Sequence, residues 1–153
     1  MRQSYNIQWA GKDLGQESRV ALGDINGDSI INIVAGTAAV SGSAYLHCFR
    51  YDDGKYYEIA RHSIGEEDTR SLRVVDIDRD GRCEIILGTN LGLSIYKFQS
   101  GQLVRIAFYP LGGEVISIAV ADIDGDGRPE IVAAVKGSNV VFVFRFEIKL
   151  VLV

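Results

Sequence analysis

Three short stretches of the chain place oxygen-rich side chains at alternate positions, a spacing that suits a hard cation. In residues 122–132, carboxylates occupy the first, third, fifth and ninth positions, and glycines occupy the fourth and sixth. Similar stretches lie at 76–86 and 24–34. Alternating carboxylates in a turning loop direct several oxygens at one point, and such oxygens are the ligands that calcium prefers. The first nine residues of these stretches are named acidic loop 1 (24–32), acidic loop 2 (76–84) and acidic loop 3 (122–130).

Apolar runs flank each acidic loop, which indicates a strand, a tight loop and a second strand. An aromatic-rich third strand follows, and the first two repeats continue with a glycine turn and a fourth strand. The loops begin 52 (24 to 76) and 46 (76 to 122) residues apart, and no segment has helical periodicity. Four short antiparallel strands in a repeat of about 50 residues form a blade of a β-propeller. The sequence therefore predicts one all-β domain over residues 1–153.

The predicted domain has three blades. Blade 1 covers about 19–62, blade 2 about 71–109 and blade 3 about 115–146. The expected strands are 19–24, 32–37, 44–51 and 56–62 in blade 1, 72–76, 84–89, 93–98 and 103–109 in blade 2, and 115–122, 130–135 and 140–146 in blade 3.

Blade 3 lacks the glycine turn and the fourth strand of the other two. Ser4 to Trp9 is predicted to be a strand, and it precedes acidic loop 1 by the distance that separates a fourth strand from the next loop. Residues 4–9 of another copy could therefore complete blade 3. Three blades do not close a ring, because propellers have about four to eight. Either the chain is a fragment of a longer protein or, as we expect, two copies form a six-bladed homodimer.

Each third strand ends in an aromatic–basic–aromatic triplet. The triplets are Phe49-Arg50-Tyr51, Tyr96-Lys97-Phe98 and Phe144-Arg145-Phe146. Alternate residues of a strand share a face, so each triplet directs two rings one way and its cation the other way. We expect the rings to fill the core between blades. A platform for a carbohydrate or a peptide is the alternative.

Two segments of the chain resemble the FG-GAP/VCBS repeats of integrin α-subunit propellers and of many bacterial secreted and surface proteins. The segments are VADIDGDGRPEIV at 120–132 and VVDIDRDGRCEII at 74–86. The resemblance covers nearly the whole chain and implies propeller blades whose loop between the first two strands binds calcium. The implied ligands are Asp122, Asp124, Asp126, the carbonyl of Arg128 and Glu130; Asp76, Asp78, Asp80, the carbonyl of Arg82 and Glu84; and Asp24, Asn26, Asp28, the carbonyl of Ile30 and Asn32.

Other readings of the acidic loops stay open. Acidic loop 1 is the weakest candidate, because two asparagines replace acids and Ser29 must adopt a backbone shape that glycine takes freely. In a metal-free alternative, the aspartates cap the amides of their own loops. The ninth-position glutamates, where many members of the family have aspartate, could also point to solvent. An EF-hand is excluded, because its loop needs a glutamate at position 12 and flanking helices.

Composition argues against several function classes. The chain of 153 residues has a net charge of −4, and ten of its 20 acids lie in the acidic loops. Nucleic acids and anionic membranes need basic patches, so neither is an expected partner. The N-terminal residues carry no apolar signal run and no stretch is long enough for a membrane helix, while the resembled family is often extracellular, so the compartment stays open. Cys48 and Cys83 are expected to be buried free thiols.

Together these features predict a non-catalytic, calcium-binding propeller module for protein interaction or assembly. A lectin-like, carbohydrate-binding propeller is the alternative. An enzyme that acts on polysaccharides is less favoured, because His47 and His62 both fall in expected strands and no Gly-x-Ser-x-Gly motif occurs. A calcium ion in an acidic loop would be structural, so chelation should lower the melting temperature.

Overall fold

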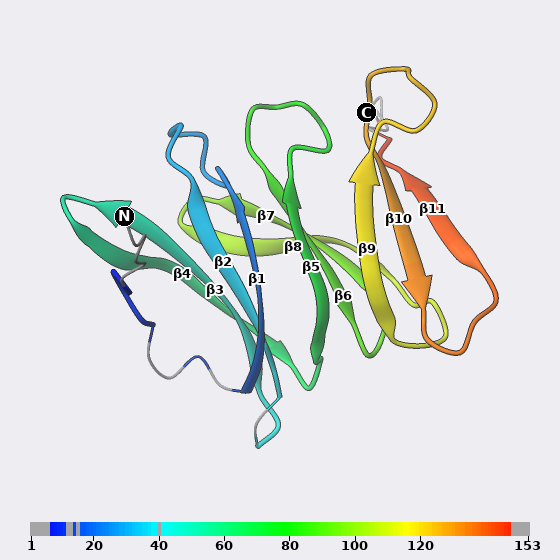
Figure 1. The fold of residues 1–153 in the computed structure, drawn as a ribbon, viewed down its shortest axis with the longest axis horizontal. Helices are drawn as coiled ribbons and strands as arrows, with labels where there is room; N and C mark the ends of the chain where they lie inside the picture. The colour runs from blue at the N-terminus through cyan, green and yellow to red at the C-terminus, as the bar shows by residue number, and fades with distance from the viewer. Residues whose placement is uncertain (1–6, 12–13, 15, 40, 148–153) are drawn as a thin grey trace, which may run out of the picture.

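The computed structural model describes residues 7–11, 14, 16–39 and 41–147, and these ranges contain strands but no helix. Figure 1 shows three antiparallel sheets side by side in an arc. Within each sheet the strands pair in chain order. The three sheets are the three expected blades. The described part of the chain offers no helix that could cross a membrane.

Blades 1 and 2 have four strands each, and blade 3 has three. Blade 1 consists of β1 (Gln16–Gly23), β2 (Asn32–Ala38), β3 (Ala44–Asp52) and β4 (Lys55–Gly65). Blade 2 consists of β5 (Thr69–Val75), β6 (Glu84–Thr89), β7 (Leu93–Gln99) and β8 (Gln102–Tyr109). Blade 3 consists of β9 (Val115–Ala121), β10 (Glu130–Val135) and β11 (Val141–Arg145). The expected strands agree with these bounds to within about three residues.

The N-terminal segment differs from its prediction. Residues 7–11 form no strand, so the prediction for Ser4–Trp9 is wrong at 7–9, while residues 4–6 lie outside the described part. The ring of Trp9 stacks 4.8 Å from that of Tyr56 and meets Phe49 edge-on at 5.2 Å. A large ring gains more from packing on this apolar surface than from pairing in a short strand.

The first strands β1, β5 and β9 lie beside one another along the arc (Figure 1), and β5 contacts both of the others. In each blade the first strand leads into the acidic loop, and the second strand leaves it. All three acidic loops therefore protrude from the same edge of the sheets, at the top of Figure 1. Strand order alone thus places the oxygen-rich loops on one rim.

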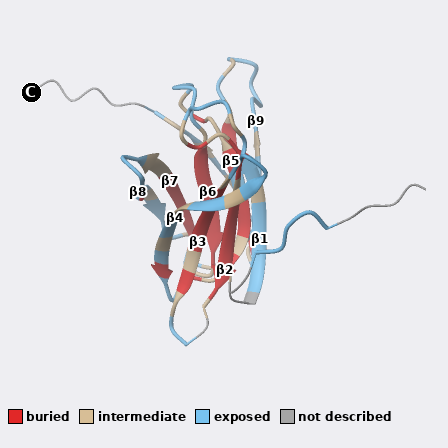
Figure 2. Cartoon of the chain, turned by 90° about the vertical axis from the view of Figure 1, so that its left-hand side faces the viewer, coloured by how far each residue is buried: buried red, intermediate tan, exposed pale blue. Residues whose placement is uncertain are grey.

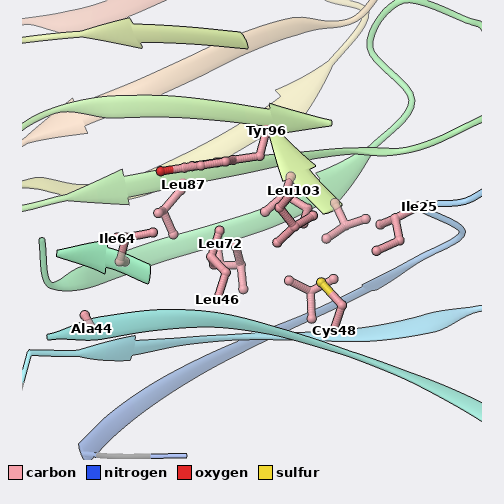
Figure 3. Close-up of a cluster of buried hydrophobic side chains, with 12 residues drawn as sticks. Ile25, Ala44, Leu46, Cys48, Ile64, Leu72, Leu87, Tyr96 and Leu103 are labelled. Atoms are coloured by element: carbon pink, nitrogen blue, oxygen red, sulfur yellow. The ribbon is translucent and has the colours of Figure 1, made fainter. Parts of the chain in front are cut away.

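Two apolar layers join the blades. The layer between blades 1 and 2 includes Leu46 and Leu72 (Figure 3). Ile85 belongs to the same layer. The layer between blades 2 and 3 includes Ile86 and Ile118. Successive residues of a strand point to opposite faces, which is why Ile85 and Ile86 belong to different layers. Burial is concentrated on the middle of the arc, whereas β1 and β9 are largely exposed (Figure 2).

Close approach of the blades requires glycine at two equivalent positions. A Cβ atom at Gly36 would lie 2.7 Å from Thr69 Oγ1, and one at Gly88 would lie 2.7 Å from Val115 Cγ1. Both distances are shorter than non-bonded atoms tolerate, so only glycine lets the first strand of the next blade pack here. The third repeat has Ala134 at this position, and no blade follows it within the described residues.

The triplet rings enter the apolar layers in blades 2 and 3 but not in blade 1. Tyr96 is 1% exposed in the first layer, and Phe144 packs against the second. In blade 1, Phe49 instead lies under Trp9, and Tyr51 is 49% exposed. The prediction of inter-blade rings is wrong there, because the described chain has no blade in front of blade 1.

Candidate metal-binding loops

The aspartate in the first position folds each acidic loop. Asp122 accepts the N–H of Gly125 through Oδ1 and that of Gly127 through Oδ2, both at 2.8 Å. Asp24 and Asp76 accept amides of their own loops in the same way. The capping bonds of the metal-free alternative are therefore present.

Each loop also needs left-handed backbone at two positions. At the sixth position, Ser29 has a φ of 65°, where Gly81 has 85° and Gly127 has 86°. The serine adopts the shape of the glycines, as expected, at a cost of roughly 1–2 kcal/mol. At the fourth position, Arg79 has a φ of 62° where acidic loops 1 and 3 have glycine. The left-handed backbone at Arg79 was not predicted from the sequence, although its alignment with Gly27 and Gly125 was a usable signal.

The ninth side chain turns inward in all three loops. Glu84 is 0% exposed and accepts the N–H of Ile77 at 2.9 Å. Glu130 and Asn32 make the same bond to the second residue of their loops. The structure excludes the alternative in which a glutamate here points to solvent, because the amide of the second residue is buried and needs an acceptor.

Carboxylates converge in acidic loops 2 and 3. Asp76, Asp78 and Glu84 each contribute one oxygen to a group whose members lie within 4.8 Å of one another, and the equivalent acids of loop 3 do the same: Asp122, Asp124 and Glu130. Calcium–oxygen bonds are about 2.3–2.6 Å long, so oxygens on opposite sides of one ion are roughly this far apart. The donors present in loops 2 and 3 therefore fit a calcium ion. The described residues of acidic loop 1 form no such group.

The fifth-position aspartates lie outside these groups. Asp80 Oδ1 accepts the N–H of Arg82 at 2.9 Å. The fifth and seventh residues of the other loops are joined in the same way: Asp126 with Arg128, and Asp28 with Ile30. In acidic loop 1, Asn26 also donates to Asp28, at 2.9 Å. Of the implied side-chain ligands in loops 2 and 3, the structure thus gathers the first, third and ninth.

The basic residue of every triplet reaches the acidic loop of its own blade. Lys97 Nζ lies 2.5 Å from Asp78 Oδ2, 2.8 Å from Asp80 Oδ2 and 3.3 Å from Glu84 Oε1. The analysis of the sequence missed this role, although the recurring triplet, whose cation points away from the rings, was a usable signal.

The other two blades repeat this contact. Arg145 contacts Asp124, Asp126 at 3.3 Å and Glu130 at 3.0 Å. In blade 1, Arg50 lies 3.2 Å from Asp28. Arginine in blades 1 and 3 and lysine in blade 2 thus occupy the same position on the third strand. The three blades therefore share a positive charge at this position.

Burial and charge pairing shift the pKa values in acidic loop 2. Burial lowers the pKa of Lys97, but its bonds to Asp78 and Asp80 outweigh this effect and raise the pKa. The bond from Lys97 lowers the pKa of Asp80. Burial raises the pKa of Glu84, whose Oε1 has no hydrogen-bond partner despite the nearby ammonium. An ammonium and several carboxylates therefore share this loop.

His47, His62 and Cys48 lie in strands of blade 1, whereas Cys83 is the eighth residue of acidic loop 2, next to Glu84. His47 Nδ1 is 2.6 Å from Glu58, and the histidine is 4% exposed on β3. His62 packs edge-on against Tyr96. Cys48 and Cys83 are free, as expected, although Cys83 is only half-buried. Burial and then Glu58 raise the pKa of Cys48 to about 12, which leaves an unreactive thiol.

Comparison with known families gives a result that agrees with this geometry. The profile of the FG-GAP-like repeat family matches residues 24–87 and 76–133. Each match begins at the first aspartate of an acidic loop and ends in the strand after the next acidic loop. The comparison with curated proteins gives no match. The two matched segments together span well over half of the 153 residues, and the chain therefore belongs to the FG-GAP-like repeat family.

Proposed function

We propose that this chain is a non-catalytic β-propeller interaction module whose acidic loops 2 and 3 each bind one calcium ion. The observation that carries the proposal is the convergence of three carboxylates in each loop, with oxygens within 4.8 Å of one another. Family membership supports the coarser part, a propeller-like module for interaction. The calcium ions go beyond what membership alone implies.

In acidic loop 2 the ligands would be Asp76, Asp78 and Glu84, joined by Asp80 and the carbonyl of Arg82. The equivalent residues would serve in acidic loop 3: Asp122, Asp124, Asp126, Glu130 and the carbonyl of Arg128. Acidic loop 1 is the poorest site, because Asn26 and Asn32 remove two charges. A bound ion would supply positive charge that offsets carboxylate repulsion and fixes the connection between the first two strands.

Titration calorimetry with calcium chloride on the chelator-treated chain tests this proposal. Asp78→Asn and Asp124→Asn should each remove one of the two binding events, and the double variant should remove both. Asp53→Asn, in the turn between β3 and β4, is the matched control and should bind as the unaltered chain does. A chain that releases no binding heat, or a double variant that binds normally, would contradict the calcium sites.

We propose a second copy of the chain as the partner that covers the ends of the arc. On blade 3, Ile123, Val141 and Val143 are 58%, 60% and 59% exposed. Their counterparts in blade 2 are buried against blade 3: Ile77, Leu93 and Ile95. The exposed face of blade 3 thus has the pattern that the arc already uses to hold a following blade.

The other end of the arc carries the complementary pattern. On blade 1, Val20 and Leu22 are 67% and 63% exposed. Their counterparts Leu72 and Val74 in blade 2 are buried against blade 1. Blade 3 of one copy can therefore pack against blade 1 of another in the same way as neighbouring blades pack inside the arc. Two such contacts close a ring of six blades. The exchange of residues 4–9 between copies stays a prediction.

Light scattering tests the assembly. A mass near twice 16.8 kDa is expected. Val143→Glu and Leu22→Glu should each give a monomer, because each places a charge in the shared face. Val104→Glu, on β8 of the middle blade, is the control and should leave the dimer intact. A monomeric unaltered chain, or a dimer that tolerates both end-face charges, would contradict the second copy as partner.

An aromatic cluster in blade 1 favours the lectin-like alternative. Tyr51 is 49% exposed, and its ring lies 5.1 Å from that of Tyr56, which stacks on Trp9. Exposed rings of this kind combine an apolar face with a polar tip, which suits sugar rings. Binding on a glycan array that Tyr51→Ala abolishes and Tyr109→Ala preserves would favour this alternative.

A further inference from the structure

The strand register explains why the triplet cation meets the acidic loop. In blade 3, β10 pairs with β11 so that Glu130 lies opposite Arg145. In blade 2, Ile85 pairs with Tyr96, which brings the adjacent Glu84 and Lys97 together across the sheet. Opposed charges on neighbouring strands attract each other. The ninth residue of each loop and the centre of each triplet therefore form one cross-strand unit.

We propose that Lys97 and Arg145 are tethered counter-cations, which hold acidic loops 2 and 3 folded without metal and compete with calcium for the same carboxylates. This inference rests on the proposed calcium sites. It assigns a role to the third strand, which contributes none of the ligands considered above.

The geometry of acidic loop 2 makes the two cations compete. Lys97 Nζ is 2.5 Å from Asp78 and 3.3 Å from Glu84, and both acids belong to the converging group. An ammonium and a calcium ion cannot both sit at contact distance from the same oxygens. The loop contains four carboxylates, three of which contact the ammonium, so a negative charge remains to attract a divalent ion. Exchange of one cation for the other is therefore the expected behaviour.

The three blades show a gradation that fits a counter-cation. Lys97 and Arg145 each contact three carboxylates in loops that contain four acids. Arg50 contacts one carboxylate in acidic loop 1, which contains two. The side chain of Lys97 is 17% exposed and that of Arg145 is 40% exposed. Because water screens an exposed charge more strongly, Lys97 should compete with calcium more effectively than Arg145.

Lys97→Met tests the proposal, because methionine keeps the length of the side chain and removes its charge. Calcium affinity is measured by titration calorimetry, and melting temperature is measured in chelator and in calcium. We expect the variant to bind calcium at acidic loop 2 at least tenfold more tightly than the unaltered chain does. In chelator its melting temperature should fall by several degrees, and calcium should restore it. Arg145→Met should show the same changes, smaller in size, at acidic loop 3.

Two controls separate charge from shape. Lys55→Met, at the exposed start of β4, should change neither calcium affinity nor melting temperature. Lys97→Arg keeps the charge and should bind calcium within about threefold of the unaltered chain. A Lys97→Met variant that folds and binds calcium no more tightly than the unaltered chain would overturn the proposal. If Lys97→Met is too unstable to titrate, the Arg145→Met result decides.

The same experiment distinguishes failure of this inference from failure of the calcium sites. If neither the unaltered chain nor any variant binds calcium, the proposed function fails and competition is overturned with it. If the unaltered chain binds calcium and Lys97→Met binds it equally well or more weakly, the calcium sites stand and only the counter-cation is overturned.

Discussion

Acidic loops 1 and 2 share a backbone shape and differ in charge. Asn32 accepts the N–H of Ile25 at 3.0 Å, and Glu84 accepts that of Ile77 at 2.9 Å. A neutral amide oxygen therefore does the same structural work as a carboxylate oxygen. The first and ninth side chains set the shape of an acidic loop, whereas its capacity for a cation depends on charge added at the third and ninth positions.

The basic residue of the third strand also differs between these two blades. Arg50 contacts one acid in acidic loop 1, while Lys97 contacts three in acidic loop 2. The number of carboxylates that the basic residue of the third strand contacts thus rises with the number of acids in its loop. Shape and charge are separable features of these loops, and four experiments test that separation.

The largest effect is expected where the loops are alike. Asp24→Ala and Asp76→Ala each remove a carboxylate that accepts two or more loop amides. Both should lower the free energy of unfolding in chelator by about 3 kcal/mol, because each removes two or more hydrogen bonds to a charged acceptor. Urea denaturation measures the change, with Glu66→Ala as an exposed control. A loss confined to Asp76→Ala would show that the first position acts through metal rather than through shape.

The sequence revealed the features that depend on neighbouring residues. Alternating apolar residues and glycine turns located the strands, and the spacing of acids located the loops. The left-handed backbone at Ser29 followed from its alignment with two glycines. Each of these features is encoded within a few residues, so a single stretch of sequence carries the information.

Features that depend on contacts between strands were missed. The meeting of Lys97 with Asp78 depends on the register of β6 and β7, which loop spacing does not specify. The bond that Glu84 accepts from the buried amide of Ile77, seven residues earlier, was not predicted either. Phe49 packs against Trp9 because the described residues contain no blade in front of blade 1. Each requires knowledge of which strand lies alongside which.

The next effect comes from making acidic loop 2 resemble acidic loop 1. Glu84→Gln keeps an acceptor for the Ile77 amide, so stability in chelator should change by less than about 1 kcal/mol. It removes a converging carboxylate, so stabilisation of loop 2 by calcium, about 2.7 kcal/mol at a hundredfold excess over Kd, should be lost. Thermal unfolding with and without calcium measures both. A variant that keeps the full calcium gain would show that Glu84 is not a ligand.

The reverse exchange should give a smaller change. Asn32→Asp places a carboxylate where the side chain is 0% exposed, next to a loop that already contains Asp28. We expect a loss of about 1–2 kcal/mol in chelator, because a buried charge is costly. Calcium should now offset this loss and bind at one additional site, which titration calorimetry would count. Asn139→Asp is the exposed control. An unchanged number of sites would mean that shape, rather than charge, excludes metal from acidic loop 1.

The smallest expected effect comes from exchanging serine and glycine at the sixth position of the two loops. Ser29→Gly should stabilise the chain by about 0.5–1 kcal/mol, because it relieves the left-handed strain of a residue with a φ of 65° while adding freedom to the unfolded chain. Gly81→Ser in acidic loop 2 should destabilise by a similar amount, and a Cβ atom there meets no neighbour that could add a clash. Urea denaturation in chelator measures both. Opposite signs of similar size would show that the two loops share one backbone, whereas equal signs would show that Ser29 is held in place by contacts particular to acidic loop 1.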